Sequence, residues 1–179
     1  MKRIPLFITI ILIAGIATTK ANNHKSISLS KMAIPNDSLR LAELDYFWTE
    51  LSRTVSEGDF EGYKACYHDD AVVLFTTRED KASMSITKAL ANWKQDFIDT
   101  KAGKTENSVE FRFSQRIGDE TTAHETGIFM FKSNDSHGKV IAKQYIHFEV
   151  LLVKHNNAWQ ALMEYQKSKA TEVAWALLE

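Results

Sequence analysis

Cysteine is nearly absent from this 179-residue chain, and proline is scarce. The only cysteine, Cys66, cannot form a disulfide within the chain, so the fold must rely on its hydrophobic core. The sequence also lacks a Ser-His-Asp order, a phosphate-binding loop, a CxxC pair and an HExxH motif. It therefore gives no support to the enzyme classes that these motifs mark.

An excess of basic residues is also missing. The chain has 22 lysines and arginines against 23 acidic residues. Removal of residues 1–21 would take away Lys2, Arg3 and Lys20 and no acidic residue, which leaves 19 basic residues and a net charge of −4. A mildly acidic protein does not attract phosphate backbones, so we expect no nucleic-acid partner.

The N-terminus has the pattern of a secretory signal peptide. A short basic start is followed by the apolar run Leu6–Ala17 and by small residues near Ala21. We expect a signal peptide over residues 1–21, a flexible lead-in over residues 22–36, and export to the periplasm or the medium. An uncleaved N-terminal anchor is the alternative, because the two kinds of segment overlap in length. No membrane span is expected in the mature chain.

Apolar residues at spacings of three and four predict three helices in the front half of the domain. The first helix begins near Asp37 and ends before Gly58, a glycine suited to a left-handed position. Asp59 can cap the second helix, and the third is expected over 86–98. The three stripes are Leu41, Leu44, Trp48, Leu51 and Val55; Phe60, Tyr63 and Tyr67; and Leu90, Trp93 and Phe97.

The second half of the chain reads as strands. Alternating and β-branched residues predict strands over 71–76, 109–114, 121–132, 140–153 and 159–167. His68-Asp69-Asp70 would lie where the second helix turns into the first strand and serve a structural role. The predicted fold is an α+β domain over residues 37–179, a curved, cone-like antiparallel sheet with about three N-terminal helices on its concave face.

Three short motifs in this order resemble the nuclear transport factor 2-like superfamily, in particular its SnoaL-like (ketosteroid-isomerase-like) members. They are FWTELSRTVSEGDFEGYKACYHDDAVVLF, Glu125-Thr126-Gly127 and the hairpin Lys154–Trp159. The sequence departs from the family pattern at Ser83-Met84-Ser85 and at Asn157, where glycines are usual. The resemblance implies one pocket enclosed by the sheet and the helices, and often dimerisation through the outer sheet face. It does not imply an activity.

The long strand 140–153 carries the residues most suggestive of chemistry. One face is nearly all apolar, and the other presents Tyr145, His147 and Glu149 in succession. A histidine beside a carboxylate in an apolar strand suits general acid–base chemistry. That face could equally be an ordinary solvent-facing one, because alternation does not reveal which face is concave.

We predict a small-molecule-binding pocket for an apolar or mixed-polarity ligand. The candidate pocket residues are Tyr63, Tyr67, His124, Tyr145, His147, Glu149 and Glu164. A cofactor-free isomerase, cyclase or hydro-lyase is the alternative, with His147, Glu149 and Glu164 as catalytic candidates and Tyr145 or Tyr63 as proton donor. A third hypothesis is a non-catalytic module that dimerises through Ile146, Phe148, Val150 and Leu152. We expect a homodimer, no cofactor, and no metal at His124, His147 and Glu149.

Overall fold

The structure is a computed structural model that describes residues 35–77 and 79–178. The predicted signal peptide and residues 22–34 of the predicted lead-in lie outside the described residues. Residues 35 and 36 belong to the first helix, which begins two residues before the predicted start at Asp37. None of the helices in the described part of the chain has the length and apolar character that crossing a membrane requires.

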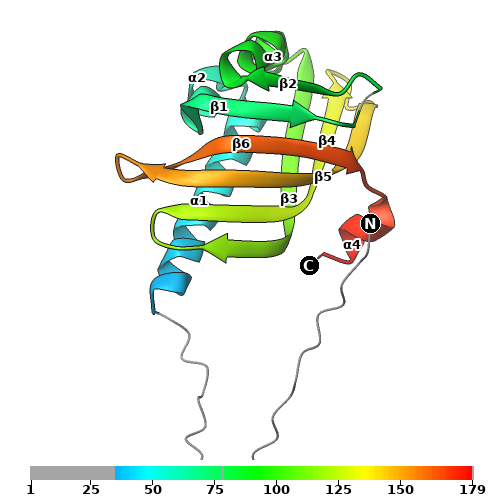
Figure 1. Ribbon diagram of the computed structural model, residues 1–179. Helices are drawn as coiled ribbons and strands as arrows, with labels where there is room; N and C mark the ends of the chain where they lie inside the picture. The colour runs from blue at the N-terminus through cyan, green and yellow to red at the C-terminus, as the bar shows by residue number, and fades with distance from the viewer. Residues whose placement is uncertain (1–34, 78, 179) are drawn as a thin grey trace, which may run out of the picture. The chain divides into compact units, whose positions relative to one another are not determined.

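Helix α1 (Pro35–Glu57) packs lengthwise on the sheet and passes behind it in Figure 1. Its buried apolar side chains are Leu44, Phe47, Trp48 and Leu51. Gly58 follows with a φ of 65°, as predicted for the left-handed position. A Cβ atom at Gly58 would lie 2.5 Å from the backbone oxygen of Phe97, so the glycine also allows close contact with the third helix.

Two further helices complete the layer. Asp59 caps α2 (Phe60–Ala65), because its carboxylate accepts the N–H of Gly62 at 3.0 Å. Ser85 caps α3 (Ile86–Lys101) in the same way. Helix α3 contacts α1, α2 and the sheet, so it covers the opening between the helices and the strands.

Six strands form one curved sheet in the order β2-β1-β6-β5-β4-β3. The strands are β1 (Tyr67–Phe75), β2 (Ala82–Ser85), β3 (Thr105–Gly118), β4 (Thr122–Asp135), β5 (Val140–His155) and β6 (Ala158–Lys169). All neighbours are antiparallel except β1 and β6, which are parallel. The predicted α+β class and curved sheet are confirmed, and the parallel pair makes the sheet mixed.

Strand register decides which side chains face the helices. On β5, Gln144, Ile146, Phe148 and Val150 point inward, and Phe148 lies 5.8 Å from Trp48 of α1, ring centroid to ring centroid. The hypothesis of a dimer surface made by Ile146, Phe148, Val150 and Leu152 is therefore wrong. These four residues are at most 3% exposed, because α1 and the sheet enclose them.

The structure differs from the sequence prediction at three places. His68-Asp69-Asp70 lies within β1 rather than before it. The short strand β2 and the C-terminal helix α4 (Glu172–Ala176) were not predicted. Helix α4 lies on the outer face of the sheet, where Trp175 packs against Ile128 and Met130.

A buried carboxylate ties α1 to the sheet. Glu125 of β4 is completely buried and accepts hydrogen bonds from the indole N–H of Trp48 and from the guanidinium of Arg116, each at 2.5 Å. Arg116 also binds Asp45 of α1.

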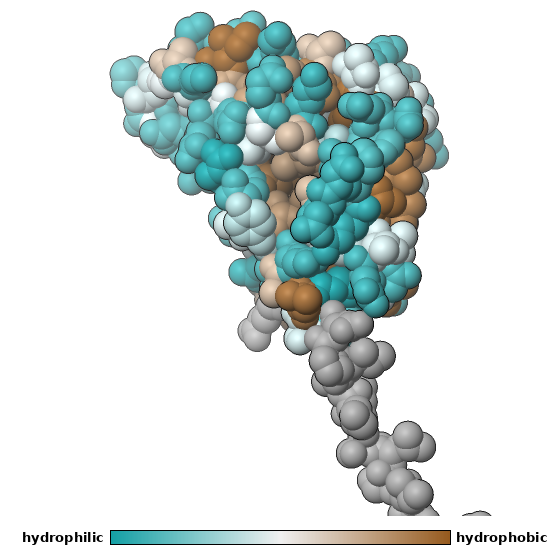
Figure 2. Space-filling view, turned by 90° about the vertical axis from the view of Figure 1, so that its left-hand side faces the viewer, coloured by the Kyte–Doolittle hydropathy of each residue, from teal (hydrophilic) through white to brown (hydrophobic). Residues whose placement is uncertain are grey.

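Large apolar side chains lie mainly in the core, and Figure 2 shows a largely hydrophilic surface with separate hydrophobic patches.

Candidate functional site

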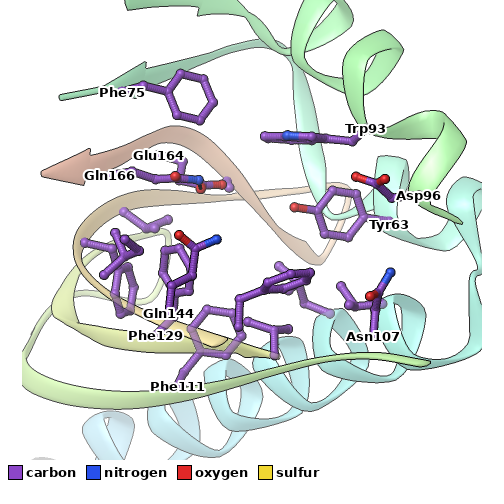
Figure 3. Close-up of a pocket in the computed structure, with 18 of the residues that line it drawn as sticks. Tyr63, Phe75, Trp93, Asp96, Asn107, Phe111, Phe129, Gln144, Glu164 and Gln166 are labelled. Carbon is purple, nitrogen blue, oxygen red and sulfur yellow. Dashed lines mark hydrogen bonds between the residues drawn. The ribbon is translucent and has the colours of Figure 1, made fainter. Parts of the chain in front are cut away.

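A cavity of about 630 Å³ lies between the helices and the inner face of the sheet. Its walls come from α1, α2, α3 and from five of the strands (Figure 3). The aromatic residues that line it are Phe47, Trp48, Tyr63, Tyr67, Phe75, Trp93, Phe97, Phe111, Phe129, Phe131 and Phe148. The ring faces suit the apolar part of a ligand, and polar side chains lie among them.

Inside this apolar wall lies a short chain of polar groups. The Tyr67 hydroxyl donates to Oε2 of Glu164 at 2.5 Å, and the hydroxyls of Tyr63 and Tyr67 are 3.0 Å apart. Because Tyr67 gives its only proton to Glu164, Tyr63 donates to Tyr67. Gln166 donates to Oε1 of Glu164 at 2.8 Å. The carboxylate is thus held on both oxygens.

The surroundings of these hydrogen-bonded side chains shift the pKa values of Glu164, Tyr63 and Tyr67. Burial raises the pKa of the Glu164 carboxyl, although the hydrogen bonds from Tyr67 and Gln166 act in the opposite direction. Burial also raises the pKa values of Tyr63 and Tyr67, and the Glu164 charge adds to both shifts. A carboxyl with a raised pKa among apolar side chains is a candidate for proton transfer near neutral pH.

More polar groups line the cavity away from Glu164. Asp96 comes from α3, and Asn107 is the third residue of β3. Figure 3 shows the two side chains on the same side of the cavity. Gln144 projects from β5, and Lys169 lies at the end of β6. These groups give the cavity polar positions in addition to the Glu164 carboxylate.

Three of the predicted pocket residues lie in this cavity: Tyr63, Tyr67 and Glu164. Tyr63 lies on α2, as its place in the apolar stripe predicted. Tyr67 was predicted on the same helix but is the first residue of β1. Glu164 pairs with Val150 on β5 and with Val73 on β1, and this register turns its side chain inward.

His124, His147 and Glu149 lie outside the cavity, on the opposite face of the sheet. They share a shallow, open hollow with Lys167. Nε2 of His124 is 3.7 Å from Oε2 of Glu149, and Lys167 hydrogen-bonds the same carboxylate. The Lys167 hydrogen bond lowers the pKa of Glu149, which makes this carboxylate a weaker base than Glu164.

Tyr145 also lies on the outer face, under α4. Its hydroxyl donates to Glu172 at 2.7 Å, and its ring centroid is 5.8 Å from that of Trp175. Its contacts are therefore with the C-terminal helix. Within residues 35–77 and 79–178, no group of three or more histidine, cysteine or acidic side chains is placed to hold a metal ion.

Several residues of the cavity were not predicted from the sequence. Gln166 lies two residues after Glu164 on the same face of β6, so the period of a strand could have identified it. Asp96 lies three residues after Trp93 on α3, and helical spacing could have linked the two. Asn107 lies before the strand predicted over 109–114, but β3 already begins at Thr105.

These features define a class: an α+β protein with a cavity under a curved sheet. The chain has the nuclear transport factor 2-like fold, as the solved structures that it resembles show. A nuclear transport factor 2-like protein of unknown function from Shewanella oneidensis is 13% identical, with a TM-score of 0.56, over 72% of this chain and 98% of that one.

Two more structures share the fold. A ketosteroid isomerase-like protein from Erwinia carotovora atroseptica is 16% identical, with a TM-score of 0.54, over 74% of this chain and 97% of that one. The beta subunit of the benzoate 1,2-dioxygenase from Burkholderia mallei is 16% identical, with a TM-score of 0.57, over 70% and 87%. No protein-family model and no curated protein matches the sequence.

Proposed function

We propose that this protein is exported and binds a small molecule in the aromatic cavity. The observation that carries the proposal is the cavity itself, about 630 Å³ lined by many aromatic rings and by the Glu164 carboxyl, whose pKa burial raises. That volume lies within the usual range of ligand pockets, roughly 300–1,000 Å³. The ligand would have an apolar body and at least one polar group that reaches Glu164, Gln166 or Tyr63.

A second candidate function is cofactor-free proton transfer in the same cavity. The raised pKa of Glu164 favours it, because a carboxyl tuned upward can both take and return a proton. Ionised Glu164 would remove a proton from a bound carbon or oxygen acid. The Tyr67 hydrogen bond would keep its carboxylate in place during this step. Isomerases, cyclases and hydro-lyases use such chemistry.

Three variants, one in the cavity and two on the outer face, separate the two faces of the sheet. Native mass spectrometry of the purified protein would first identify any retained small molecule, and a compound screen would supply ligands otherwise. Glu164→Gln should weaken binding or abolish turnover, whereas Glu149→Gln and His147→Ala on the outer face should change neither. Full activity in Glu164→Gln together with loss in Glu149→Gln would place the function on the outer face.

We also propose a homodimer through the outer sheet face, as the family resemblance implies. Val72, Met163 and Leu151 are register partners across β1, β6 and β5, and Val72 is 40% exposed. This row offers partly exposed apolar side chains to a second copy. Sedimentation at micromolar concentrations tests the proposal, and a monomer at every concentration would refute it.

Export is tested by the N-terminal sequence of the mature protein, which is expected to begin after Ala21.

A further inference from the structure

Hydrogen-bond acceptors gather at the side of the cavity between α3 and the start of β3. The Thr100 hydroxyl donates to the backbone oxygen of Asp96 at 2.8 Å. Its only proton is used there, so it accepts the hydrogen bond from Nδ2 of Asn107, also at 2.8 Å. These two bonds fix the orientation of the Asn107 amide.

The other end of that amide is an acceptor. Oδ1 of Asn107 is buried and has no hydrogen-bond partner among the described residues. Buried polar atoms without a partner are uncommon in folded proteins. Asn107 lines the cavity, and an N–H or O–H group of a bound molecule would satisfy this oxygen once the amide shifts enough to expose it.

Asp96 is an exposed aspartate that adds a negative charge to the same side of the cavity (Figure 3). Its carboxylate makes no hydrogen bond or ion pair with any residue that the structure describes. Figure 3 shows it next to the rings of Trp93 and Tyr63, on the same side of the cavity as Asn107. The two ring centroids are 5.9 Å apart. Aromatic rings with a carboxylate beside them form an environment that attracts an organic cation.

The charges around the cavity also favour a positively charged ligand. Among the described residues that line it, the carboxyl and amino side chains are Glu79, Asp96, Glu164 and Lys169, three acidic and one basic, and the pKa of Glu164 is raised. Asn107 on β3 and Lys169 on β6 are separated by three strand spacings, about 14 Å. Along the sheet, Lys169 therefore lies well apart from Asn107, and no ion pair joins it to Asp96 among the described residues.

We propose that Asp96, Asn107, Trp93 and Tyr63 form an ammonium subsite, so that the ligand of the cavity is an apolar molecule with a protonated amine. The inference rests on the proposed function, because it assigns a ligand class to the same cavity. The amine would donate to Oδ1 of Asn107 and to the Asp96 carboxylate. Its apolar body would lie among the aromatic rings deeper in the cavity.

Three compounds with one bicyclic body test the proposal: 2-naphthylmethylamine, 2-naphthalenemethanol and 2-naphthoic acid. At pH 7.5 they present an ammonium, a hydroxyl and a carboxylate. Isothermal titration calorimetry on the mature protein should give the order amine, alcohol, acid, from tightest to weakest. Asp96→Asn should lower affinity for the amine about two- to fivefold, as expected for an exposed ion pair, and leave the alcohol unchanged.

Two more variants complete the experiment. Asn107→Leu should weaken binding of the amine and the alcohol and leave the acid unaffected. Asp69→Asn is the control, because Asp69 is an exposed aspartate of β1 that does not line the cavity. Equal binding of the amine and the alcohol, or tightest binding of the acid, would refute the ammonium subsite and keep the pocket. Absence of binding by all three compounds would refute both the subsite and the proposed pocket for such molecules.

Discussion

Replacement of Glu125 by glutamine should destabilise the domain strongly. Glu125 is 0% exposed, and its carboxylate accepts from Trp48 and Arg116. A glutamine amide would turn an NH₂ group toward one of these donors. Loss of one partner of a buried charged pair costs about 3–5 kcal/mol. Arg116 is 20% exposed and keeps Asp45, so we expect a loss of about 3 kcal/mol, the lower end of that range.

Thermal and urea denaturation measure this loss. A loss of that size corresponds to a fall in Tm of about 6–12 °C for a domain of this length. Glu110→Gln is the matched control, because Glu110 is exposed on β3, and it should change stability by less than about 0.5 kcal/mol. Adding Arg116→Met to Glu125→Gln should restore part of the stability, since it removes the guanidinium that has lost its buried partner. If Glu125→Gln unfolds like the control, Glu125 does not hold α1 on the sheet.

Three other perturbations have expected outcomes. The folded-state pKa of Glu164 is raised, so the folded protein binds this proton more tightly than the unfolded chain, and stability falls as the pH rises from the unfolded value through the folded one. Glu164→Gln should remove that fall in urea denaturation between pH 4 and pH 8, and an unchanged pH profile would contradict the assignment. Burial raises the pKa of Cys66 to about 12, so a thiol reagent at pH 8 should label it only as the protein unfolds; fast labelling of the native protein would show an accessible thiolate. Trp175→Ala should cost about 3 kcal/mol, because its ring is buried against the outer sheet face, whereas Val173→Ala on the same helix, where the side chain is 71% exposed, should stay within about 0.5 kcal/mol. Equal stability of these two variants would mean that α4 does not stabilise the sheet.

Local signals in the sequence were sufficient for much of the fold. Asp59 and Gly58 act through their own side chain and backbone, and their roles at the helix ends were predicted. The Asn156-Asn157 turn, with φ values of 51° and 64°, follows from the same kind of local preference. The pairing of β1 with β6 depends on contacts about 90 residues apart, so no local pattern indicates that it is parallel.

The site was harder to predict for the same reason. Alternation along β5 separates Phe148 from His147 and Glu149, but it gives no information on which face is concave. Packing of Trp48 against Phe148 decides this, because α1 covers the apolar face. Glu164 was identified because it alternates along β6 in a register that happens to turn inward. Asn107 and Asp96 become neighbours only through the folded contact between α3 and β3.

The positions of the four tryptophans give the protein a set of internal fluorophores. Trp48 and Trp93 line the cavity, Trp159 donates to Glu43 at 3.0 Å, and Trp175 belongs to α4 and packs on the opposite face of the sheet. Occupation of the cavity should therefore change the emission of the first pair, while events on the outer sheet face should change that of Trp175. Single Trp→Phe variants would let one unlabelled protein report both surfaces separately.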